Sequence, residues 1–321
     1  MSAETYTPDY ETFEVKEVHD LTGPGTPTGM PTGLTCRWPA DVPPKACVVF
    51  GHGLGENARS YAALCAYWAA HGYLVIQPSF ADWIVALAAE DPEIGEGLEG
   101  RDAMSWAAYD EVRPRVLAKL HQPFYWLDRI RIVREILDGA EAVMEATCGV
   151  PAEPVPFAIA GHSFGAYLSQ VLAGARIDVP RKGPTVFREE RFKAAILLSA
   201  QGRDQQGLRE GSWNTMTGPV LNVTGTRDGG AKGQDWHWKC EPYDFAPPGD
   251  KYLAVFEDAA HYLGGIGRET RLDDNPDQRE AVAQLTLAFM DAHVAGETNA
   301  RDWLVAIDDY IGNCPVMFKR K

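Results

Sequence analysis

The stretch of sequence that decides the fold is Phe157–Ala166, FAIAGHSFGA. A short apolar run leads into the pentapeptide GHSFG, whose serine is Ser163, and a segment of helical character follows. This order fits the G-x-S-x-G motif, in which a serine occupies a sharp turn between a strand and a helix. Glycine on both sides of the serine lets the strand and the helix approach each other without a Cβ between them. The pattern predicts that Ser163 is a catalytic nucleophile, with an ordinary structural turn as the alternative.

Outward from this motif, apolar runs alternate with amphipathic segments along the chain. This alternation predicts an α/β protein with a mostly parallel sheet covered by helices on both faces, and no break in composition divides residues 1–321 into separate domains. The predicted strands are Phe13–Val18, Leu34–Trp38, Ala46–Phe50, Tyr73–Gln77, Phe157–Ala160, Ala194–Leu198, Val220–Thr224 and Tyr252–Phe256. The predicted helices are Ala58–His71, Trp126–Thr147, Ala166–Ala175 and Arg279–His293.

A serine hydroxyl needs a base to remove its proton, and the base needs a carboxylate to orient it. His261 is the best base, because it follows the predicted strand Tyr252–Phe256 after a short turn. Asp228 is the best acid, because it lies directly beyond the predicted strand Val220–Thr224 in the segment TGTRDGG. Asp258 and Asp204 are the alternative acids. The order Ser, Asp, His along the chain is the order found on α/β sheets that carry this motif.

Two backbone N–H groups are expected to stabilise the negative charge that develops on the substrate oxygen. One belongs to Phe164, the residue after the nucleophile. The other belongs to the glycine-rich loop after Ala46–Phe50, where Leu54 is favoured over Gly53.

The segment Phe80–Pro123 does not have the pattern of a core strand, and it predicts an inserted cap or a lid-like excursion. Aromatic side chains in this segment and in Trp213–Trp238 could line an apolar substrate pocket. For each one singly, packing within an irregular region is the simpler interpretation. We take Gly53, Trp83, Trp106, Trp236 and Trp238 as candidate substrate-binding residues. Arg129 and Arg131 lie on the amphipathic helix, where exposure to solvent is the simpler interpretation.

Composition excludes several classes of partner. The 321 residues carry a net charge of −15, which argues against nucleic acid and against an anionic membrane surface. No apolar run reaches the length of a membrane span, and the acidic N-terminus lacks the pattern of a secretory leader, so a cytoplasmic location is expected. The six scattered cysteines have no metal-like spacing and indicate reduced thiols, with a Cys240–Cys314 disulfide as the alternative. The oligomeric state stays open.

Together these motifs resemble the α/β-hydrolase superfamily over about residues 46–293. The segments GHSFGA, TGTRDGG and EDAAHYLGG are similar to those of the dienelactone-hydrolase-like and platelet-activating-factor-acetylhydrolase-like esterases. The resemblance implies an eight-stranded, mostly parallel sheet and hydrolysis of carboxylic esters without a cofactor or metal. It places Ser163, Asp228 and His261 on motif positions of that family.

The sequence therefore predicts a serine esterase for small to medium, hydrophobic acyl or aryl esters, acting through an acyl-enzyme. A thioesterase, an amidase or an acyltransferase could use the same three side chains. A ligand-binding protein that keeps the fold without catalysis is the alternative from another class.

Overall fold

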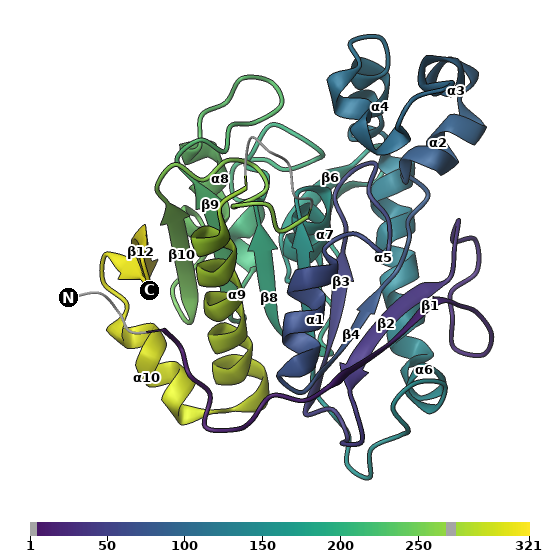
Figure 1. Cartoon of the computed structure of the whole chain (residues 1–321). Helices are drawn as coiled ribbons and strands as arrows, with labels where there is room; N and C mark the ends of the chain where they lie inside the picture. The colour runs from purple at the N-terminus through teal and green to yellow at the C-terminus, as the bar shows by residue number, and fades with distance from the viewer. Residues whose placement is uncertain (1–4, 268–273) are drawn as a thin grey trace.

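A computed structural model describes residues 5–267 and 274–321 of the chain. They form an α/β structure around a large sheet, with helices packed in front of and behind it (Figure 1). The sheet has ten strands in the order β1-β2-β4-β3-β5-β8-β9-β10-β12-β11.

The central part of the sheet is parallel and both edges are antiparallel. The parallel strands are β3 (Ala46–Gly51), β4 (Tyr73–Gln77), β5 (Phe157–His162), β8 (Phe192–Leu198), β9 (Val220–Gly225) and β10 (Lys251–Phe256). The antiparallel strands are β1 (Val15–Leu21) and β2 (Leu34–Pro39) at one edge, and β11 (Tyr310–Ile311) and β12 (Cys314–Arg320) at the other. A separate hairpin consists of β6 (Arg176–Val179) and β7 (Gly183–Val186).

Helices follow most of the parallel strands. The α-helices are α1 (Ala62–Ala70), α2 (Ile84–Glu90), α3 (Pro92–Leu98), α4 (Arg113–Lys119), α5 (Pro123–Asp138), α6 (Ala140–Glu145), α7 (Phe164–Leu172), α8 (His237–Asp244), α9 (Pro276–Met290) and α10 (Thr298–Ala306). Two short 3₁₀ helices, η1 (Ala103–Ala108) and η2 (Ser212–Thr215), and a π-helical turn, η3 (Asp291–Ala295), complete the set.

The two faces of the sheet bury two separate hydrophobic clusters. On β3, Val49 packs into the cluster with α5 and α7, whereas Val48 and Phe50 pack into the cluster with α1 and α9. Successive side chains of a strand point to opposite faces, so a strand that is apolar at every position is covered on both sides. This burial explains why the continuous apolar run ACVVF forms a central strand.

The prediction of eight strands is wrong, because the sheet has ten. The additional strands β11 and β12 lie near the C-terminus, where β12 pairs with β10 and β11 pairs with β12. Most side chains of β12 are at least partly exposed. β12 lies beside the edge strand β11, and its apolar run, residues 316–318, is short, with Pro315 before it and Lys319 after it, so the pattern that revealed the central strands did not reveal it.

The predicted helix Trp126–Thr147 is divided in two. It begins earlier, at Pro123, and is interrupted at Gly139 between α5 and α6. The backbone of Gly25 crosses the helix there so closely that a Cβ on Gly139 would overlap it. Contact with the distant loop around Gly25 sets this boundary. The helical periodicity of apolar residues does not depend on that contact and so could not predict it.

The segment predicted as an excursion contains the helices α2, α3 and α4 and the 3₁₀ helix η1, which lie above the sheet in Figure 1. Its apolar side chains, among them Ile84, Leu87 and Ile94, are buried in the same cluster as those of α5 and α7. The excursion is therefore packed onto the core and extends one face of it. All six cysteines are free thiols, which contradicts the alternative Cys240–Cys314 disulfide.

Candidate active site

Ser163 sits on a tight turn between β5 and α7. Its backbone has φ 53° and ψ −113°, outside the regions that L-residues ordinarily occupy. The turn is held by the Ser163 N–H, which donates to the carbonyl of Leu198 at 2.8 Å. A Cβ on Gly165 would overlap the carbonyl oxygen of Gly51 on β3, and a Cβ on Gly161 would overlap the backbone of Gly165. The glycines of the motif are thus required by the close approach of α7 to β3 and β5.

Ser163, His261 and Asp228 form a continuous hydrogen-bonded series. The Ser163 Oγ lies 3.1 Å from the His261 Nε2, and the His261 Nδ1 lies 2.9 Å from the Asp228 Oδ1. Because a carboxylate only accepts hydrogen bonds, it holds the proton on Nδ1 and leaves Nε2 free to accept the proton of the serine. The Asp228 side chain is fully buried, whereas that of His261 is 38% exposed.

The ends of adjacent parallel strands bring these residues together. Ser163 follows β5, Asp228 follows β9 and His261 follows β10. Between β5 and β9 in the sheet lies β8, and Ser199 comes directly after it. All these loops leave the carboxyl edge of the sheet, which is where open α/β sheets place their sites.

Three side chains that sequence reasoning missed complete the surroundings of Asp228. The Lys239 Nζ lies 3.7 Å from the Asp228 Oδ1 and donates to the Ser199 Oγ at 3.0 Å. The Ser199 Oγ also lies 2.9 Å from the His261 Nδ1, and Thr224 donates to the other oxygen of Asp228 at 2.8 Å. Nothing in the spelling of the segment around Lys239 singles this lysine out from the others.

These partners decide the charge of Asp228. Burial acts to raise the pKa of its carboxyl, but the positive charge of Lys239 and the hydrogen bond to His261 outweigh burial, so the pKa lies well below its ordinary value. Burial lowers the pKa of Lys239, and the charge of Asp228 opposes that effect. The two groups form a buried ion pair behind the imidazole.

His162, the second residue of the pentapeptide, has a positioning function. Its Nε2 donates to the backbone carbonyl of His261 at 2.7 Å, and its Nδ1 accepts from the Tyr61 hydroxyl at 2.8 Å. Burial, with a further contribution from His261, lowers the pKa of His162 to about 3, so the ring is neutral. The Tyr61 hydroxyl also accepts from the Gly53 N–H at 3.3 Å. One network therefore connects the loop after β3, the nucleophile turn and the loop that carries His261.

This network bears on the expected backbone donors. The Gly53 N–H is engaged by Tyr61, whereas the N–H groups of Leu54 and Phe164 make no hydrogen bond to any residue that the structure describes. Phe164 is also the first residue of α7, where a helix exposes unpaired N–H groups and a partial positive charge. Both predicted donors are thus unpaired within the described part of the chain.

The loop after β3 is fixed from beneath by Arg129. Its guanidinium makes a two-point ion pair with Asp82, at 2.9 and 2.6 Å, and donates to the carbonyl of His52 at 2.7 Å. The predicted exposure of Arg129 is wrong, since the side chain is only 1% exposed, while Arg131 is partly exposed and pairs with Asp128 and Glu135. The helical spacing of residue 129 from Trp126 and Val133 could have placed it on the buried face.

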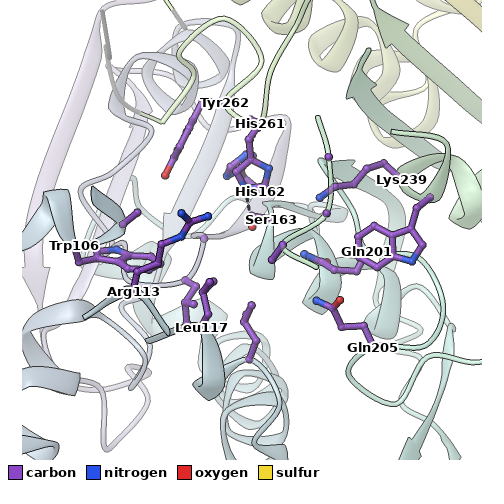
Figure 2. A pocket seen from close by; sticks show the side chains of 18 residues that line it. Trp106, Arg113, Leu117, His162, Ser163, Gln201, Gln205, Lys239, His261 and Tyr262 are labelled. Carbon is purple, nitrogen blue, oxygen red and sulfur yellow. Dashed lines mark hydrogen bonds between the residues drawn. The ribbon is translucent and has the colours of Figure 1, made fainter. Parts of the chain in front are cut away.

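A cavity of about 320 Å³ opens over Ser163 (Figure 2). Trp106, Arg113 and Leu117 from the excursion lie on one side of Ser163 in this view, and Gln201, Gln205 and Lys239 lie on the other. The excursion therefore forms one wall of the cavity. That wall combines apolar side chains with the guanidinium of Arg113, and the opposite wall carries amide and ammonium groups.

The candidate substrate-binding residues are divided by the structure. Gly53, Trp106 and Trp238 line the cavity, and Trp238 is fixed by its Nε1, which donates to the carbonyl of Arg203 at 2.9 Å. Trp83 and Trp236 do not line it. Trp83, at the start of the excursion, packs against the core cluster, and Trp236 stacks on the neighbouring ring of His237. Composition could not separate these tryptophans, because only the path of the chain decides which indole faces the cavity.

The alternative acids are exposed. Asp258 lies on the surface and its N–H donates to the Thr226 hydroxyl, and Asp204 is also exposed. In the described part of the chain, the acidic partner of His261 is Asp228, and neither alternative acid contacts the imidazole.

Within residues 5–267 and 274–321, no group of three or more His, Cys, Asp or Glu side chains is arranged to hold a metal ion. No helix among these residues has the length and apolar character needed to cross a membrane. The chain matches no known protein-family model, and no curated protein matches its sequence.

Proposed function

We propose that this protein is a serine hydrolase that cleaves carboxylic esters through an acyl-enzyme intermediate. The observation that carries the proposal is the series Ser163–His261–Asp228, with contacts of 3.1 and 2.9 Å, at the floor of a cavity. A serine with a purely structural function does not require a strained turn or a hydrogen-bonded series of imidazole and buried carboxylate. This combination is the one that activates a serine hydroxyl as a nucleophile.

In the proposed reaction, His261 Nε2 takes the proton of Ser163 as Oγ attacks the ester carbonyl carbon. The C=O π bond opens, and the negative charge that forms on oxygen is bound by the N–H groups of Leu54 and Phe164. The imidazolium then protonates the leaving alcohol as its bond to carbon breaks. Water, deprotonated by His261, attacks the acyl-enzyme by the same path and releases the acid and free Ser163.

We also propose that the chain has the α/β-hydrolase fold. The proposal is supported by the strand–turn–helix at Ser163, by the order Ser, Asp, His along the chain, and by the mostly parallel sheet with helices on both faces. In this interpretation β11 and β12 are an addition beyond β10 at one edge.

The cavity bears on the proposed substrate. About 320 Å³ holds an ester of modest size, and the apolar wall of Leu54, Trp106 and Leu117 fits a hydrocarbon or aryl group. The opposite wall, with the amides of Gln201 and Gln205, fits a polar group on the other side of the scissile bond. We therefore propose a substrate with one apolar and one polar half.

The decisive experiment replaces the nucleophile. Ser163→Ala should lower kcat for a short-chain chromogenic ester by roughly four to six orders of magnitude, because the remaining groups act as a unit with the serine. Ser169→Ala, a serine on α7 that bonds only the carbonyl of Gly165, is the matched control and should stay within a few-fold of the parent. Activity that survives in Ser163→Ala would remove this serine from the mechanism. A parallel panel of thioesters and amides separates an esterase from the related acyl-transfer enzymes.

A further inference from the structure

Lys239 is an unusual residue to find beside the proposed triad. Its side chain is 3% exposed, and lysine is rarely buried unless its charge is paired. The backbone of Lys239 has its own partner, since the Asn222 amide donates to its carbonyl at 2.9 Å. Packing of α8 therefore accounts for the main chain and leaves the position of the ammonium group to be explained.

The ammonium group is directed at the acid side of His261. Besides Asp228 at 3.7 Å, it contacts the Oγ of Ser199 at 3.0 Å and the carbonyl of Ser199 at 3.3 Å. The Ser199 Oγ is in turn 2.9 Å from the His261 Nδ1. Lys239 is thus connected to the imidazole of His261 in two ways, each through one intervening side chain. One connection runs through the carboxylate of Asp228 and the other through the hydroxyl of Ser199.

We propose that Lys239 is a positioning residue that opposes protonation of His261 and so extends the activity of the site to lower pH. The inference rests on the proposed function. When His261 is protonated, the new positive charge is stabilised by Asp228 but repelled by Lys239, and the burial of these two partners leaves their charges weakly screened. The ion pair of Lys239 with Asp228 makes the surroundings of the imidazole close to neutral, where an isolated carboxylate would make them negative.

The other titratable groups that face His261 do not take over this function. His162 on β5 is neutral, because burial holds its pKa at about 3. Tyr262 follows His261, and its hydroxyl donates to Glu56 in the loop after β3 at 3.0 Å. Among the described residues, Lys239 is the one lysine or arginine that forms an ion pair with Asp228.

The experiment compares pH profiles of kcat/KM for a neutral ester in the full-length protein. Lys239→Gln keeps a hydrogen-bond donor near Ser199 and removes the charge, whereas Lys239→Arg keeps the charge. In Lys239→Gln the acid limb of the profile should move to higher pH by about one unit, because loss of the positive charge makes both His261 and Asp228 easier to protonate. In Lys239→Arg the acid limb should stay close to that of the parent.

The control is Lys193→Met, which removes one exposed positive charge on β8 away from the site. The concentration of competent sites is measured by titration with a fluorophosphonate, so that a partly unfolded variant changes the amplitude and not the position of the limb. If the glutamine variant does not fold, Lys239→Met provides the uncharged substitution of matched length.

Several results overturn the inference. An acid limb that does not move in any uncharged, folded variant contradicts it, as does a shift of the same size in Lys193→Met. A rise in KM with an unmoved limb would make Lys239 a substrate-binding residue. These outcomes leave the proposed function intact, because that function fails only if the parent shows no hydrolysis or if Ser163→Ala retains it.

Discussion

The strained backbone at Ser163 fixes the position of its hydroxyl group. A positive φ in a residue with a Cβ costs of order 1–3 kcal/mol, and such residues persist only where the surroundings fix them. Here the Ser163 N–H is tied to Leu198 and the flanking glycines are pressed against neighbouring backbone. The result is a hydroxyl that lies within hydrogen-bond distance of His261 Nε2.

At this scale the structure makes a prediction about the acid. Asp228→Asn should lower kcat by about 10⁴-fold, because an amide cannot hold the proton on Nδ1 of His261 and stabilise the imidazolium. Asp258→Asn changes an exposed residue and should stay within a few-fold of the parent. Steady-state kinetics of both variants on one ester checks this. The opposite ranking would show that Asp228 is not the orienting carboxylate.

Among the elements, β3, β5 and α7 are locked together by glycine. The contact between α7 and β3 runs through Gly165 and the carbonyl of Gly51, with no side chain between them. This close packing fixes the first turn of α7 against the end of β3. The helix and the strand therefore act as one unit in placing Ser163, the proposed nucleophile, and the N–H of Phe164, the proposed donor.

Gly165→Ala tests this contact. The added methyl would have to displace backbone atoms of β3, so the variant should lose at least about 3 kcal/mol of unfolding free energy, or fail to fold. Gly218→Ala is the matched control, since a Cβ there meets nothing within 4 Å. Urea denaturation followed by circular dichroism measures both. Equal stability of the two variants would show that α7 does not need this close approach.

Across the whole molecule, buried neutral histidines couple stability to pH. Burial places the pKa of His52 well below its ordinary value and lowers the pKa of His162 to about 3. Between that range and the unfolded value near 6.5, the unfolded chain binds more protons than the folded one. Stability is therefore fully present above about pH 6.5 and is lost as the pH falls.

We expect the free energy of unfolding to decrease between pH 7 and pH 5, by at most about 1.4 kcal/mol per pH unit for each of these histidines. His162→Gln should show a shallower dependence on pH, because one buried group no longer titrates. His237→Gln, which replaces an exposed histidine, should keep the slope of the parent. Urea unfolding at a series of pH values provides the measurement. A slope that is unchanged in His162→Gln would refute the assignment.

The local motifs of the candidate site could be identified from the sequence alone. The pentapeptide around Ser163 signals its own turn, because the required glycines and serine are adjacent in sequence. Asp228 and His261 could be selected because each closely follows an apolar run, and parallel strands end at a common edge. The aromatic side chains of the cavity could be named only as a group, since Trp83 and Trp106 belong to the same excursion and only the second lines the cavity.

By itself, the sequence determined the alternation of strands and helices and the loops that hold Ser163, Asp228 and His261. These features depend on short-range periodicity and on residues close together in the chain. The tertiary structure alone decided that Lys239 is buried against Asp228, that Arg129 supports the loop after β3, and that two further strands extend the sheet beyond β10. Each of these features depends on contacts between segments far apart in the chain. The local sequence around a charged side chain or an outer strand does not indicate whether a distant segment will pack against it.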